Sequence, residues 1–147
     1  MQSKILLLFL SLILFSHMSA AQNKTDDIVG RWLTAGKEPA KIDIYKKGEN
    51  YYGRIIWLKN PTDKGKPRVD GNNPDSAKRN NPTIGLVMLI GFKFDGENEW
   101  KDGFIYDPES GKTYSAYLSL KEKNTLEVRG YVGISLFGRT ETWTRVN

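Results

Sequence analysis

The densest cluster of carboxylate and amide side chains lies between Asp70 and Pro82, in the stretch DGNNPDSAKRNNP. Oxygen ligands at this spacing are typical of calcium sites. An EF-hand loop, however, needs ligands at fixed positions, a central glycine and a final glutamate. Counted from Asp70, Pro74 occupies a ligand position, Asp75 the glycine position and Asn81 the glutamate position. We therefore expect no metal site here, and nothing in the chain predicts a cofactor.

Cysteine and histidine are nearly absent. The chain has no Cys and a single His, His17, which lies in a segment that we expect to be removed. Nucleophilic Cys-His and Ser-His-Asp sites, zinc sites and thiol redox chemistry are therefore excluded. Acid and base catalysis by paired carboxylates remains, but no spacing marks such a pair, and most carboxylates lie in turns. We expect no enzymatic activity; the carboxylates considered are Asp63, Asp70, Asp75, Asp102, Asp107 and Glu141.

The N-terminus has the pattern of a signal peptide. Lys4 precedes an apolar stretch, residues 5–15, and small residues end at Ala21. The apolar stretch is shorter than the roughly 20 residues that span a membrane. We expect residues 1–21 to be a signal peptide and residues 22–147 to form one domain. The product would be periplasmic or secreted, without membrane insertion.

The charges predict no nucleic-acid partner. The net charge is +5, and the Lys and Arg residues are scattered among Asp and Glu rather than clustered. Scattered charges are typical of a solvated surface.

The rest of the chain alternates apolar and polar residues between turn signals such as Asp95-Gly96, which indicates antiparallel strands joined by hairpins. Closing such a meander into a barrel removes its exposed edges. We therefore predict an all-β, single eight-stranded antiparallel up-and-down barrel, with strands near 28–34, 40–46, 51–58, 84–94, 99–107, 112–120, 124–132 and 138–146.

The apolar strand faces predict the barrel interior. A barrel of this size holds either a side-chain core or one small ligand, and the alternation pattern does not decide between them. The residues predicted to line the interior are Ile56, Met88, Ile90, Phe92, Trp100, Phe104, Tyr106 and Tyr114.

Within the long connection 59–83, the stretch 70–82 is predicted to cap the mouth of the barrel. Asn73-Pro74 and Asn81-Pro82 are turn initiators. Between them, Asp75 is placed to cap one short helical turn that ends at Arg79. Asp70, Asp75 and Arg79 would then be mainly structural, although they would lie beside any ligand entrance.

The last strand has two polar faces. Arg139, Glu141, Trp143 and Arg145 share one face and threonines share the other. We favour inward threonines, with the charges exposed. The alternative turns the arginine face inward, so that Arg139 and Glu141 form a buried pair that holds a polar head group.

The segment GYVGISLFG, just before that strand, exposes Ile134, Leu136 and Phe137 between glycines. It would be either a plug at the barrel end or an apolar contact patch for a partner.

Gly30-x-Trp32 at the first strand and Arg145 on the last resemble the lipocalin and calycin arrangement, in which the Trp closes the barrel floor and the Arg packs over its ring. The ordered segments IVGRW, YYGRIIWLKNP, GKPRVDGNNPD, GLVMLIGFKFDG, GFIYDPESGKTY and LEVRGYVGISLFGRTETWTRV resemble the bacterial family called domain of unknown function 2147. The resemblance implies an exported lipocalin-like barrel with no established activity. Family members often carry Cys where this chain has Tyr52 and Ala116, so that disulfide cannot form here.

We therefore predict a non-catalytic exported binding protein that holds a small apolar or amphipathic molecule in its barrel. The alternative is an envelope interaction module that has a filled barrel and binds a protein partner or a cell-wall component. The sequence leaves the oligomeric state open.

Overall fold

The computed structural model describes residues 24–147, and the predicted signal peptide lies outside this range. Within it, no helix is long and apolar enough to cross a membrane. The helical elements described are two 3-10 turns, η1 (Lys24–Asp26) and η2 (Ser76–Lys78).

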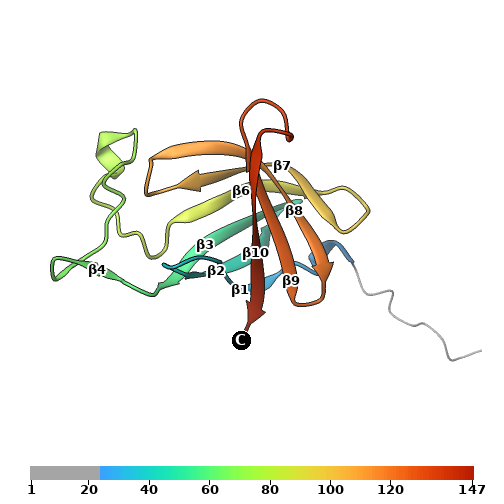
Figure 1. Cartoon of the computed structure of the whole chain (residues 1–147), viewed down its shortest axis with the longest axis horizontal. Helices are drawn as coiled ribbons and strands as arrows, with labels where there is room; N and C mark the ends of the chain where they lie inside the picture. The colour runs from blue at the N-terminus through green and yellow to red at the C-terminus, as the bar shows by residue number, and fades with distance from the viewer. Residues whose placement is uncertain (1–23) are drawn as a thin grey trace, which may run out of the picture.

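Eight antiparallel strands close into one barrel, in the order β1-β10-β9-β8-β7-β6-β3-β2 (Figure 1). This confirms the predicted all-β, lipocalin-like barrel. Two further strands form a small hairpin in the long connection between β3 and β6. The barrel strands are β1 (Gly30–Leu33), β2 (Ala40–Lys47), β3 (Asn50–Leu58), β6 (Val87–Phe94), β7 (Glu99–Asp107), β8 (Lys112–Glu122), β9 (Thr125–Tyr131) and β10 (Gly138–Val146), and the hairpin strands are β4 (Thr62–Asp63) and β5 (Lys66–Pro67).

One end of the barrel is closed by the segment that precedes β1. The indole Nε1 of Trp32 donates a 2.9 Å hydrogen bond to the Ile28 carbonyl, and Nε1 of Trp100 donates one of 3.0 Å to the Thr25 carbonyl. The Arg145 guanidinium lies 4.3 Å from the centroid of the Trp32 ring. Large side chains fill the adjacent half of the interior, so this end is a packed floor.

Gly103 makes room for part of this floor. The Phe92 ring lies so close to it that a Cβ at Gly103 would come within 2.5 Å of the ring. A glycine on the inner face of β7 therefore allows a phenylalanine to pack against bare backbone.

Bulges reverse the predicted inward orientation of Ile90. Between β3 and β6 the register shifts, and Gly91 has a φ of 72°. Leu89 and Phe92 both face inward as a result, although they are three residues apart. Ile90 pairs with Phe104 on the outer wall, so its predicted inward orientation is wrong.

A second bulge has the same effect on β7. Asp102 has a φ of 59°, and the pairing with β8 shifts between Trp100 and Gly103. Both of those residues are buried inside, whereas Phe104 is 48% exposed on the outer wall. The predicted inward orientation of Phe104 is therefore wrong.

The predicted inward orientation of Ile56 is also wrong. The register between β2 and β3 shifts beside it, and Ile55 instead faces the interior with 3% exposure. At Ile90 and Phe104 strict alternation fails because a bulge adds one residue to a strand and reverses the faces that follow. At Ile56 the alternation of Tyr51, Gly53 and Ile55 is regular and itself places Ile56 outside.

Candidate functional site

A cavity of about 1400 Å³ occupies the open end of the barrel. The connections β1–β2, β3–β6, β7–β8 and β9–β10 all lie at this end, opposite the packed floor. The interior of the barrel is thus divided into a packed half and a hollow half. The sequence left open whether the barrel holds a side-chain core or a ligand cavity, and the structure has one in each half.

The wall of the cavity is mainly apolar. Its inner part is formed by Ile55, Met88, Ile105, Val128 and Trp143. Trp143 is 1% exposed and lies where the cavity meets the packed floor. Apolar walls of this kind bind the apolar portion of a ligand.

Sequence reasoning named part of this wall. Met88, Tyr106 and Tyr114 line the cavity, whereas Phe92 and Trp100 lie in the packed floor with no exposure. Ile55, Ile105 and Val128 were not named as ligand-binding residues. Val128 follows the alternation of its strand, so its pattern could have found it. Ile55 likewise alternates with Tyr51 and Gly53, whereas Ile105 follows a bulge that the pattern does not reveal.

Polar groups on β10 lie at the cavity wall. Glu141 pairs with Val128 and Trp143 pairs with Leu126, which turns the arginine face of β10 inward. The favoured prediction, inward threonines, is therefore wrong. The indole of Trp143 is the largest apolar group on the strand, and burying it determines the orientation.

Arg139 and Glu141 do not form a buried pair, because Arg139 lies at the rim. Its Nη2 is 3.5 Å from Oε1 of Glu141, but its side chain is 86% exposed and that of Glu141 is 36% exposed. The Nε1 of Trp143 donates a 3.2 Å hydrogen bond to Oε2 of Glu141. Glu141, the one carboxylate on β10, thus lies beside the apolar wall of the cavity.

The rim of the cavity carries both signs of charge. Basic and acidic side chains both come from the β1–β2 connection, the β3–β6 connection and β10, and further acidic ones come from the β7–β8 turn. Among residues 24–147, no three carboxylates come together in a way that could hold a metal ion. The rim residues of this kind are Lys37, Glu38, Lys59, Asp63, Lys64, Lys66, Arg68, Asp107, Glu109 and Arg139.

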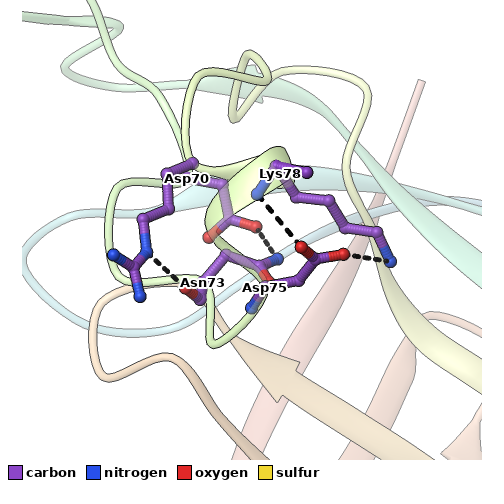
Figure 2. Close-up of polar contacts among 6 residues, drawn as sticks. Asp70, Asn73, Asp75 and Lys78 are labelled. Carbon is purple, nitrogen blue, oxygen red and sulfur yellow. Dashed lines mark hydrogen bonds and ion pairs between the residues drawn. The ribbon is translucent and has the colours of Figure 1, made fainter.

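The polar stretch, here called the polar loop (residues 70–82), is closed at its base. Val69 pairs with Pro82, and the Asp70 amide donates a 2.9 Å bond to the Asn81 carbonyl. Asp75 caps η2 by accepting a 3.0 Å bond from the Ala77 amide. Figure 2 shows Asp70, Asn73, Asp75 and Lys78 around this turn.

Asp70 is 1% exposed and has two donors. Tyr106 donates a 2.7 Å hydrogen bond to its Oδ1, and Nδ2 of Asn73 donates one of 2.7 Å to its Oδ2. Burial raises the pKa of Tyr106 to about 12, and the bond to Asp70 adds to this rise. Asp70 thereby holds the polar loop onto β7.

The polar loop lies at the edge of the mouth rather than across it. Asn72 donates a 2.7 Å bond to the Glu109 carbonyl in the β7–β8 turn, and Asn72 and Gly71 line the cavity. Asp75 and Arg79 are exposed and do not line it. The prediction of a cap spanning the mouth, with these two beside the entrance, is therefore wrong. The loop docks on a neighbouring turn instead.

These features define the class of the protein. A closed eight-stranded antiparallel barrel, with a packed floor bearing a Trp and an Arg and a hollow mouth, is lipocalin-like. Residues 30–145 match the family described as uncharacterized proteins conserved in bacteria (DUF2147), and the chain belongs to this family.

A solved structure has the same fold. It is the protein HP1028 from the human pathogen Helicobacter pylori, described as belonging to the lipocalin family. The two chains are 24% identical, with a TM-score of 0.73 over 81% of this chain and 82% of that one. No curated protein matches this chain.

Proposed function

We propose that this protein is a non-catalytic binding protein that holds a small apolar or amphipathic molecule in the open half of its barrel. One observation carries the proposal, the cavity of about 1400 Å³ above a packed floor. Pockets for small ligands are typically about 300–1,000 Å³, so there is room for such a molecule and for an open entrance.

The wall and the rim suggest how the ligand lies. Its apolar part would contact Ile105, Val128 and Trp143, and its polar part would face Glu141 and the charged rim. Burying a few apolar groups against this wall gives roughly 25 cal/mol for each Å² removed from water. Affinity would thus come from the wall, and orientation from the rim.

The proposed location is the periplasm or the outside of the cell. It follows from the signal-peptide pattern of residues 1–21, which is a feature of the sequence alone. Ligand capture in that compartment is consistent with a barrel that needs no disulfide, since the chain has no Cys.

Two neighbouring residues on β7 provide a matched test. Ile105 lines the cavity, while Phe104 is exposed on the outer wall. Ile105→Trp places a larger side chain in the cavity, and Phe104→Trp places the same side chain on the outer wall. The mature chain, purified from its bacterial host, would be examined by native mass spectrometry. We expect a co-purifying small molecule in the wild type and in Phe104→Trp, and its loss in Ile105→Trp.

Trp143 supplies a second readout because it is buried at the inner end of the cavity. An apolar fluorescent probe that enters the cavity should change the emission of Trp143, and Trp143→Phe should remove that change. If the wild type carries no molecule and binds no apolar probe, the binding function is contradicted.

One observation favours a second candidate, an envelope interaction module. Leu136 and Phe137 are 75% and 70% exposed at the open end of the barrel. Crosslinking in the native host would test it. The module is supported if a specific protein partner appears and is lost in Phe137→Ser, while the cavity stays empty.

A further inference from the structure

The β9–β10 loop (residues 132–137) carries the most exposed large apolar side chains of the described residues. Val132, Ile134, Leu136 and Phe137 are 58–75% exposed, whereas the others in this group are 39–48% exposed. They follow one another closely on a single loop, which extends beyond the strands at the upper side of the barrel in Figure 1. Large apolar groups concentrated in this way usually mark an interaction site.

The loop has a defined conformation. The Phe137 amide donates a 3.1 Å bond to the Ile134 carbonyl, and the Val132 amide donates one of 3.3 Å to the Phe137 carbonyl. The side chain of Arg129 also holds the loop in this conformation. Its Nε donates a 2.8 Å bond to the Ser135 carbonyl, and its Nη1 donates one of 2.9 Å to Oγ1 of Thr140. The backbone hydrogen bonds thus hold the apolar side chains out in solvent.

The charged residues that directly flank the loop are both arginines, although Glu141 lies 3.5 Å from Arg139 and the rim as a whole carries both signs of charge. Residues 128–140 contain Arg129 and Arg139 and no carboxylate. The side chain of Arg139 is 86% exposed, and Lys64 and Lys66 are exposed on the same cavity rim. An apolar tip with flanking cations complements an apolar layer covered by anionic head groups.

The loop is also continuous with the cavity. Val132 and Phe137 belong to the cavity lining as well as to the exposed tip. A surface that covered the tip would therefore lie directly over the mouth of the barrel.

We propose that the β9–β10 loop is a membrane-docking element that inserts its apolar tip into the interfacial layer of an anionic bilayer. A protein partner, the second candidate given above for Leu136 and Phe137, would need more than this loop, because stable protein interfaces use about 20–30 residues on each side. Four apolar side chains on one loop are enough for interfacial insertion, with Arg139 placed at the head groups. Docking in this way does not depend on whether the cavity is occupied.

The test is flotation of the mature chain, residues 22–147, with two kinds of vesicle. One contains phosphatidylethanolamine and phosphatidylglycerol, and the other contains only phosphatidylcholine. We expect binding to the anionic vesicles. Phe137→Ser should weaken it about tenfold, which corresponds to about 1.4 kcal/mol, because it removes an aromatic side chain from the interfacial layer. Arg139→Gln should weaken binding to the anionic vesicles about fivefold.

Phe104→Ser is the matched control, because it removes an exposed phenylalanine from the outer wall. It should leave vesicle binding unchanged. Ile105→Trp should also keep vesicle binding while it loses the cavity probe, which separates docking from ligand binding. The proposal is overturned if the wild type does not float with anionic vesicles or if both Phe→Ser variants lose binding equally. It is also overturned if the loop forms a dimer in sedimentation velocity that Phe137→Ser abolishes.

Discussion

Tyr106 on β7 and Asp70 in the polar loop are joined by a 2.7 Å hydrogen bond, although they are 36 residues apart in the chain. Both are buried, with 7% and 1% exposure. The bond anchors the one long polar connection of the barrel to the wall beside the cavity mouth. It gives Asp70 a structural role in this connection.

Removing the hydroxyl of Tyr106 should therefore destabilise the protein. Tyr106→Phe leaves the Oδ1 of a buried carboxylate without its donor, which costs about 1–3 kcal/mol in the free energy of unfolding. Urea denaturation measures this loss, and hydrogen exchange should increase at the amides of residues 70–82. Tyr114→Phe is the control, since Tyr114 lines the cavity and makes no hydrogen bond to a carboxylate of residues 24–147. Equal losses in the two variants would contradict the anchoring role.

The same tyrosine predicts a loss of stability at high pH. The pKa of Tyr106 is raised from 10.0 to about 12, chiefly by burial and then by the bond to Asp70. The folded state therefore keeps a proton that the unfolded state releases between these values. The stabilisation is complete below pH 10 and decreases as the pH approaches about 12.

Urea midpoints measured between those two pH values should fall in the wild type and fall less in Tyr106→Phe. Tyrosinate absorbance should show one fewer late-titrating group in that variant. Parallel pH profiles for the two proteins would exclude Tyr106 as a source of the effect.

Gly111 should be sensitive to the smallest substitution. It has a φ of 70°, and an added Cβ would lie 2.0 Å from the Asn72 carbonyl oxygen. Gly111→Ala should therefore displace the polar loop from the β7–β8 turn as well as strain the backbone. Backbone strain alone costs about 1–2 kcal/mol, and the clash adds to it.

Gly48→Ala separates the two costs, since Gly48 has a φ of 63° and no atom within 4 Å of the added Cβ. Limited proteolysis should cut the polar loop faster in Gly111→Ala than in Gly48→Ala. If both variants were cut at the wild-type rate, the contact of Asn72 with this turn would not be what holds the polar loop in place.

Arg145 should not be replaceable by lysine. Besides stacking on Trp32, it donates a 2.9 Å bond to the Lys123 carbonyl and one of 3.0 Å to the Val29 carbonyl. A lysine has neither the planar fork nor the stacking face. We expect Arg145→Lys to lower the free energy of unfolding by about 1.5–3 kcal/mol.

Thermal and urea unfolding measure this change. Arg139→Lys is the comparison, because the Arg139 side chain is 86% exposed and its replacement should change stability by less than about 0.5 kcal/mol. A tolerated Arg145→Lys would show that the floor is held by packing alone.

Local signals were sufficient for the architecture. Alternation and turn residues located all eight barrel strands, and the order of hairpins indicated closure. Asp75 was predicted as a cap because an N-cap depends only on the residues just after it. Trp32 and Arg145 marked the two strands that meet at the floor.

The candidate site was predicted less well, because it depends on which way side chains face. At Ile90 and Phe104 a bulge in the tertiary pairing reverses the faces, and a one-residue shift leaves the local alternation looking regular. On β10 both faces are polar enough to be exposed. Only the packing of Trp143 against its neighbours decides between them.

The amino-acid sequence alone thus determined the number and order of the barrel strands, the closed barrel and the lack of Cys chemistry, because these depend on local periodicity and composition. The tertiary structure alone decided that half the barrel is hollow and that Asp70 meets Tyr106. A cavity depends on the summed volume of side chains from eight strands, and that contact joins segments that only the closed barrel brings together.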